Sequence, residues 1–219
     1  MKKINIKASA DFGNSSTKII VVDGVGMKAR IQPTLTSYLP TVPRFEDDDM
    51  GTLIANLHKN MIVHITSPSI THNGLYAVGE SSYNHDGTGL NIKHHKKAEH
   101  NTTIIQPLSM IAATAIQSEY NKHNELPEAL VLNVEYATAI PVVDYSKADA
   151  KHLEARLKGS HVLVAYIGEG IQCHVTINVD DARVIQEGIP ALYALVQGST
   201  TMFEAYNKRY NVNFSGADF

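Results

Sequence analysis

The stretch ADFGNSSTKIIVVDG, residues 10–24, joins two strand-like runs through a polar connection. Two turn residues are enough to reverse a β-strand, yet here Gly13 is followed by Asn14, Ser15, Ser16 and a threonine. In such a turn, backbone N–H groups and small polar side chains point into one concavity, which suits an anion such as a phosphate. The stretch therefore predicts a β-hairpin whose turn binds phosphate. A polar surface hairpin without a ligand is the alternative that the motif alone leaves open.

Two charged residues flank this turn. Asp11 stands at the end of the first strand, where a Mg²⁺ ion needs a carboxylate that acts through its water shell. Lys18 is the first residue after the turn, and its ammonium would supply positive charge to terminal phosphates. The predicted phosphate site therefore includes a magnesium position.

The composition excludes several classes of protein. With 219 residues, 43% hydrophobic and 19% charged, the chain is large and apolar enough to bury a core. A net charge of −3 gives no basic field for direct contact with nucleic acid. The single cysteine, Cys173, excludes an internal disulfide and is expected to be a buried thiol in a reducing compartment. No run reaches the ~20 apolar residues of a membrane span, so we expect a soluble, cytoplasmic protein.

Hydrophobic periodicity predicts strands and helices in an α/β arrangement. Three consecutive strands on short connections form a meander, and a later buried strand follows a helix. Strands are expected over residues 4–10, 18–22, 27–31, 53–57, 61–66, 75–78, 129–134, 161–167, 171–179 and 182–186, with turns at 168–170 and 180–181. Helices are expected over residues 101–120 and 146–158 and within 190–206. Pro107 is placed in the first turn of its helix, with Ser146 as N-cap and Gly159 as the stop of the next.

A change in residue composition along the sequence divides the chain. Prolines and an acidic run at 46–49 predict an irregular connection and a solvated turn, and the passage at 84–100 is polar and rich in histidine. We therefore expect a core formed by residues 1–35 and 98–219, with a smaller lobe inserted at residues 36–97. The basic run at 93–97 is expected to be a solvated loop, because it lacks the interleaved aromatic residues of a nucleic-acid site.

Three further motifs accompany the polar hairpin: YAVGE at 76–80, AIPV at 139–142 and QEGIPAL at 186–192. Together with DFGNSSTK at 11–18, their order and spacing resemble domain I, the first half, of the actin-like ATPases. The most similar group is the ParM and Alp group of bacterial plasmid-segregation actins. The resemblance implies an α/β, ribonuclease H-like fold, a mixed sheet with flanking helices. The core would then be subdomain IA and the inserted lobe subdomain IB.

The resemblance also implies a ligand and its site. ATP or GTP with Mg²⁺ would lie in a cleft, with Asp11 holding the metal through water. The residues that would form one wall of the phosphate site are Asp11, Gly13, Asn14, Ser15, Ser16 and Lys18. The water-activating residue of the family follows the AIPV segment on a helix, where Glu154 is the candidate and Asp149 the alternative. Simple solvation is the competing explanation for both carboxylates, since carboxylates on a short helix usually face water.

One motif of the family, the second phosphate loop Asp-x-Gly-Gly-x-Thr, is not found in this sequence. With one wall of the cleft, positioning and exclusion of water are lost, and these supply most of the catalysis in phosphoryl transfer. We therefore expect weak nucleotide binding and little or no ATPase activity from this chain alone. Whether the chain is a fragment or a natural half-protein stays open.

The resemblance implies a filament-forming ATPase for plasmid segregation that self-associates and holds DNA through an adaptor DNA-binding protein. Two other functions remain open. The first is a kinase-type member of the same superfamily, acting on a sugar or acetate. The second is a non-catalytic half-module that binds or regulates a filament partner.

Overall fold

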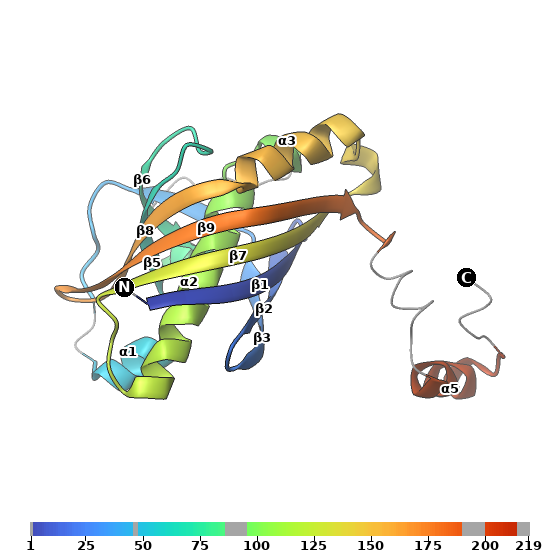
Figure 1. Cartoon of the computed structure of the whole chain (residues 1–219), viewed down its shortest axis with the longest axis horizontal. Helices are drawn as coiled ribbons and strands as arrows, with labels where there is room; N and C mark the ends of the chain where they lie inside the picture. The colour runs from blue at the N-terminus through green and yellow to red at the C-terminus, as the bar shows by residue number, and fades with distance from the viewer. Residues whose placement is uncertain (1, 46–47, 86–95, 190–199, 214–219) are drawn as a thin grey trace.

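One mixed β-sheet carries the fold (Figure 1). The computed structural model describes residues 2–45, 48–85, 96–189 and 200–213, and within them nine strands pair in the order β3-β2-β1-β7-β9-β8-β5-β6-β4. The strands are β1 (Lys2–Phe12), β2 (Ser16–Asp23), β3 (Gly26–Pro33), β4 (Thr36–Leu39), β5 (Met61–Thr66), β6 (Gly74–Val78), β7 (Ala129–Ile140), β8 (Gly159–Gly168) and β9 (Ile171–Gln186). The helices are α1 (Met50–Asn56), α2 (Thr102–His123), α3 (Lys147–Leu157) and α5 (Thr200–Tyr210), with 3-10 turns η1 (Gly79–Asn84), η3 (Lys97–Glu99) and η4 (Val142–Asp144).

The predicted meander and the mixed sheet are confirmed. Strands β1, β2 and β3 pair antiparallel in sequence order, while β1 pairs parallel with β7 and β7 parallel with β9. The helix α2 provides the crossover that brings the chain back to β7 in the same direction as β1. The carboxyl ends of β1, β7 and β9 therefore meet at one edge of the sheet.

The helices cover one face of this sheet. Along β1 the even-numbered side chains, from Ile6 to Phe12, are buried in the core that α1, α2 and α3 share. The odd-numbered side chains point the other way, and Lys3, Lys7 and Asp11 are exposed. Such alternation is the period of a half-buried strand. The other face thus carries charged and polar residues that no described helix of the core cluster covers.

The set of side chains that strand β9 turns toward the core changes in the middle of the strand. Its register with β7 shifts after Val134, which pairs with Val179, to Glu135, which pairs with Asp181, so Asp180 is an extra residue. This is a β-bulge. Odd-numbered residues such as Val179 face the core before the bulge, and even-numbered residues such as Val184 do so after it. The turn expected at 180–181 is therefore wrong, because the strand continues through the bulge.

Two further expectations are corrected. Residues 53–57 lie in and just beyond the helix α1, not in a strand, because Asp49 caps the helix by accepting a hydrogen bond from Thr52 N at 3.1 Å. A short apolar run does not reveal by itself whether it forms a helix or a strand. The expected solvated turn at 46–49 thus supplies a helix cap at its last residue, while residues 46–47 lie outside the described part of the chain. Pro107 is the sixth residue of α2 and so lies in its second turn, not its first.

Other details agree with the sequence. Ser146 is the N-cap of α3, and β7 follows α2 as a buried strand, although it runs six residues further than expected, to Ile140. The segment 36–97 adds β4, β5 and β6 to the same sheet through the pairing of β5 with β8. Its assignment as a separate lobe stays a prediction.

The helix expected within 190–206 is described from Thr200 as α5, and its first part lies outside the described residues. No described helix is long and apolar enough to cross a membrane.

Candidate functional site

The predicted phosphate turn is a short hairpin between β1 and β2. Gly13 N donates to the carbonyl oxygen of Ser16 at 2.9 Å, which closes the turn. A Cβ atom at Gly13 would lie 2.7 Å from that same oxygen, so the turn has room only for glycine. Asn14 and Ser15 at the tip are exposed, as expected for groups that meet a ligand.

A network of buried polar side chains contacts this hairpin on the side that faces the core. The hydroxyl of Thr34 donates to the carbonyl oxygen of Gly13 at 2.8 Å, and Thr34 N donates to that of Ser15 at 3.1 Å. The Thr34 hydroxyl lies 2.9 Å from that of Thr17, which donates to Gln106 Oε1 of α2 at 3.2 Å. Networks whose members are all hydrogen-bonded rigidify the segments they join. The hairpin is thus tied to the first turns of α2.

Two charged side chains face each other at the base of the hairpin. Asp11 pairs with Lys18 across the two strands, with 3.5 Å between Asp11 Oδ2 and Lys18 Nζ, and both are exposed. Both project from the face of the sheet that the helices leave open. An exposed ion pair contributes little to stability, so both groups are free to engage a ligand.

A pocket of about 670 Å³ opens at the carboxyl ends of β1, β7 and β9. In α/β sheets, ligands bind at this edge, outside the carboxyl ends of the strands. The residues that line it are Ser9, Ala10, Asp11, Lys18, Ile20, Ala137, Thr138, Ala139, Ile185, Glu187 and Gly188. Of the predicted wall residues, Asp11 and Lys18 line the pocket. Gly13, Asn14, Ser15 and Ser16 adjoin them in the chain without being among the lining residues.

Glu187 is a pocket residue that sequence reasoning did not single out. It follows directly on β9, and its backbone N donates to the carbonyl oxygen of Ile140 at 2.9 Å, which fixes it beside the end of β7. It is the second carboxylate that lines the pocket, after Asp11. Its place directly after a strand of the parallel set was the signal that would have identified it.

Glu154, the candidate for water activation, does not line this pocket. Its Oε1 accepts a hydrogen bond from Val184 N at 2.9 Å, on the stretch of β9 beyond its pairing with β8. Val184 precedes the lining residue Ile185. Glu154 thus supports the strand from the α3 side, and its catalytic role stays a prediction.

Asp149, the alternative to Glu154, belongs to the start of α3. Its Oδ2 accepts from the Ser146 hydroxyl at 2.6 Å, and Lys96 lies 3.4 Å from its Oδ1. The hydrogen bond from Ser146 is the main cause that lowers the pKa of Asp149 below its ordinary value. These contacts assign Asp149 to capping the helix.

The expectation of a solvated basic run is wrong for its last residue. Lys97 is 4% exposed, and its ammonium donates to the carbonyl oxygen of Phe12 and lies 3.2 Å from Glu187 Oε1. Residues 93–95 lie outside the described residues. Burial of the ammonium is possible because both partners compensate for lost water.

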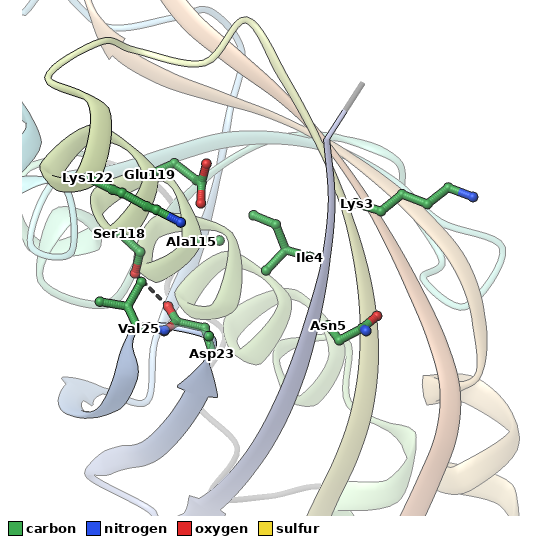
Figure 2. A pocket seen from close by; sticks show the side chains of 10 residues that line it. Lys3, Ile4, Asn5, Asp23, Val25, Ala115, Ser118, Glu119 and Lys122 are labelled. Carbon is green, nitrogen blue, oxygen red and sulfur yellow. Dashed lines mark hydrogen bonds between the residues drawn. The ribbon is translucent and has the colours of Figure 1, made fainter.

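A second pocket, of about 300 Å³, lies at the opposite end of β1 (Figure 2). Its buried carboxylate, Asp23, accepts from Val25 N at 2.8 Å, Gly26 N at 3.0 Å and the Ser118 hydroxyl at 2.7 Å. Burial alone would raise the pKa of Asp23, but these hydrogen bonds outweigh it and lower the pKa. The carboxylate is thus used within the fold, to close the β2–β3 turn on α2.

The carboxylates of the pocket at Asp11 are the residues there that could hold a metal ion. Within the described ranges no three His, Cys, Asp or Glu side chains gather as a metal cluster. Mg²⁺ keeps several waters and needs only one or two carboxylates together with substrate phosphates. Asp11, one of the two carboxylates that line the pocket, is the residue that would hold such an ion through its water shell. Cys173 is buried, as expected, and burial raises the pKa of its thiol to about 12.

Comparisons with known proteins agree with this geometry. The family model described as the N-terminal domain of actin-like proteins matches residues 9–189. The chain is similar to the actin-like protein Alp7A, with 20% identity and a TM-score of 0.61 over 89% of this chain and 47% of that one. It is similar to apo ParM of Bacillus thuringiensis, with 16% identity and a TM-score of 0.61 over 87% of this chain and 48% of that one. For the same ParM with ATP, the identity is 15% and the TM-score 0.59, over 87% and 47% of the two chains.

No curated protein sequence matches the chain. It spans about half the length of the solved structures to which it is similar. The resemblance to domain I of the ParM and Alp group is confirmed by the family match and by these structures together. Because the match covers most of its length, the chain belongs to the family of actin-like protein N-terminal domains.

Proposed function

We propose that this chain is the nucleotide-binding half of an actin-like, filament-forming ATPase, and that it binds Mg²⁺ with ATP or GTP in the pocket at Asp11. The observation that carries the proposal is that Asp11, Lys18 and Glu187, from three segments of the chain, line one pocket at the carboxyl ends of the parallel strands. The ParM structures with ATP, ADP and AMPPNP support a nucleotide as the ligand.

Each segment has a distinct task. The turn from Gly13 to Ser16 binds the phosphates through the backbone N–H groups and small polar side chains of Asn14, Ser15 and Ser16, because a turn of this kind concentrates donors on an anion. Gly13 contributes the shape of the turn, since its own N–H is bonded to the Ser16 carbonyl oxygen. Lys18 Nζ leaves Asp11 and turns to a phosphate oxygen, a stronger, charge-assisted partner. Asp11 would hold a Mg²⁺ ion through its water shell. Bound Mg²⁺ would supply positive charge to the phosphate oxygens.

Glu187 orients the attacking water. It is the lining carboxylate that follows β9, a strand separated from the hairpin by β7 in the order of the sheet. A carboxylate that accepts a hydrogen bond from water raises the electron density of its oxygen and aligns it with the phosphorus. Glu154 remains the second candidate for this role, which would require its side chain to leave Val184 N and reach the pocket.

The chain alone is expected to bind nucleotide weakly and to hydrolyse it slowly. The pocket is open on the face of the sheet that helices do not cover, and catalysis of phosphoryl transfer rests on positioning from all sides. In the whole assembly, filaments would form by self-association, and plasmid DNA would be held through an adaptor protein. The net charge of −3 agrees with a chain that does not contact DNA itself.

Titration with Mg-ATP tests the proposal. Binding is followed by the amide signals of the chain in NMR, for the wild type and for Lys18→Met. Lys7→Met is the matched control, because Lys7 is also exposed on the open face and pairs with a carboxylate, Glu135, at 3.4 Å. We expect Lys18→Met to weaken binding about tenfold, the loss of one charge-assisted bond, and Lys7→Met to leave it unchanged.

If the amide signals of the wild type do not change when Mg-ATP is added, the proposal is contradicted. That result would favour a half-module that does not bind nucleotide. Activity and assembly need a separate test. ATP-dependent sedimentation of the chain, alone and mixed with a protein that carries the second phosphate loop, would support filament formation. Phosphorylation of a sugar or acetate by the same mixture would support the kinase alternative instead.

A further inference from the structure

Lys97 joins the two walls of the nucleotide pocket from inside the protein. Its side chain is 5% exposed. The ammonium donates to the carbonyl oxygen of Phe12, the residue before the Gly13 turn, and lies 3.2 Å from Glu187 Oε1. Phe12 ends β1 and Glu187 follows β9, so one cation contacts both segments that flank the pocket.

The backbone of Lys97 is itself held in place. The hydroxyl of Thr103, in the first turn of α2, donates to the carbonyl oxygen of Lys97 at 3.1 Å. Arg156 Nη1 of α3 donates to that of Ala98 at 2.7 Å. The turn η3 is thereby bound to two helices, and it presents the Lys97 ammonium from a rigid base.

Stability does not explain why a charge occupies this position. Removing an ammonium from water is costly, and a buried ion pair can often be replaced by apolar side chains of similar volume without loss of stability. The two groups that Lys97 contacts suggest another reason. One is the carboxylate that lines the pocket, and the other is the carbonyl oxygen next to the turn on which phosphates would bind.

We propose that Lys97 is a positioning residue that fixes Glu187 and the Gly13 turn relative to each other, so that both walls of the pocket keep one geometry. This inference rests on the proposed nucleotide site. Lys97 also balances the charge of Glu187, which would otherwise repel a triphosphate. Loss of the ammonium is therefore expected to loosen both walls and to weaken the binding of Mg-ATP about tenfold.

The first test uses the amide NMR spectrum of the chain without nucleotide. Gly13 and Gly188 report on one wall each. In Lys97→Met both signals are expected to move, because both segments lose the same anchor. Lys96→Met is the matched control, since Lys96 is the neighbouring lysine but is exposed and pairs with Asp149. It is expected to leave both signals in place.

A double-mutant cycle separates coupling from a general loosening of the fold. Glu187→Gln, on one wall, is expected to shift the Gly13 signal on the other wall, and this shift should vanish in the background of Lys97→Met. A merely structural lysine would not transmit the change. If Lys97→Met does not fold, the response of Gly13 to Glu187→Gln still decides the matter.

The inference is overturned if Gly13 and Gly188 keep their signals in folded Lys97→Met, or if Glu187→Gln leaves Gly13 unmoved. A Mg-ATP titration with unchanged Kd in Lys97→Met overturns it as well. If the wild-type chain binds no Mg-ATP, the proposed function fails, while the ligand-free signals still show whether Lys97 couples the two segments.

Discussion

The hydroxyl of Thr34 donates to the carbonyl oxygen of Gly13 at 2.8 Å, and so links the end of the meander to the turn between its first two strands. Thr34 lies just beyond β3, and its side chain reaches the hairpin from the buried side. The turn on which the proposed phosphate site depends is therefore shaped before any ligand arrives. Preorganisation of this kind saves the entropy of ordering a loop upon binding.

The variant Thr34→Val tests this link. It keeps the shape of the side chain but leaves the Gly13 carbonyl oxygen without its donor, so the free energy of unfolding should fall by about 1 kcal/mol. The affinity for Mg-ATP should fall about fivefold if the turn relaxes to the same extent. Urea denaturation and NMR titration measure the two quantities.

Thr36→Val is the control for this experiment. The Thr36 hydroxyl is also buried and lies 2.8 Å from that of Thr102, but it does not touch the turn. It should lower stability by a similar amount and leave the affinity unchanged. An equal loss of affinity in both variants would show that the Thr34 contact has no special effect on the site.

Gly13→Ala should damage the hairpin itself. The new methyl group would lie 2.7 Å from the Ser16 carbonyl oxygen, so the backbone must shift, at a cost of about 1–3 kcal/mol. Nucleotide binding should be lost, while the rest of the sheet stays folded. Gly24→Ala is the matched control in the next turn, where nothing lies within 4 Å of the added atom. Full binding by Gly13→Ala would contradict a role of this turn.

Acid should weaken the fold through His161. This residue is fully buried, and its Nε2 donates to the carbonyl oxygen of Leu157 at 2.9 Å while Nδ1 accepts from the Ser67 hydroxyl at 2.7 Å. Burial lowers the pKa of His161 below its ordinary 6.5. The folded state therefore binds this proton less readily than the unfolded state. Its stability is fully present above pH 6.5 and is lost as the pH falls through the lowered folded pKa.

Urea denaturation between pH 8 and pH 5, roughly spanning the ordinary titration of histidine, measures this effect. The variant His161→Asn should show a flatter dependence on pH than the wild type. Burial also lowers the pKa of His58, so part of the slope should remain. Identical slopes for the two proteins would contradict the assignment to His161.

Cys173 should resist thiol reagents while the protein is folded. Burial raises the pKa of its thiol to about 12, and the thiolate is the reactive form. At neutral pH we expect no measurable labelling over the time in which the urea-unfolded chain reacts completely. Mass spectrometry after labelling gives the readout. Rapid labelling of the folded chain would show that β9 opens locally.

The repeating parts of the fold could be read from the sequence, because they depend on local pattern. The meander β1–β3, the helix α2 and the cap at Ser146 follow from alternation, helical spacing and N-cap chemistry. The helix α1 could not be recognised, because its apolar run is short and its identity depends on packing against α2 through Gln117, whose Nε2 donates to the Ile54 carbonyl oxygen at 2.7 Å. Tertiary contacts of this kind leave no local signal.

The same limit applies to the site. Asp11 and Lys18 could be placed together, because they belong to one hairpin and stand seven positions apart, one on each side of the turn. Glu187 and Lys97 could not, because they meet at 3.2 Å across ninety positions of the chain. A basic run is usually solvated, and only the fold shows that one of its lysines is withdrawn from water.

The bulge at Asp180 determines which side chains of the rest of β9 face the core and which face the open side of the sheet. Without that extra residue, Ile185 would turn toward the helices, and Glu187 would tend to follow it away from the pocket. Between Asp180 and Glu187, the exposed positions such as Arg183 should therefore accept many exchanges of one side chain for another, whereas the stretch as a whole should accept hardly any insertion or deletion. In this sheet, the length of the chain at one point governs which side chains reach the pocket at another.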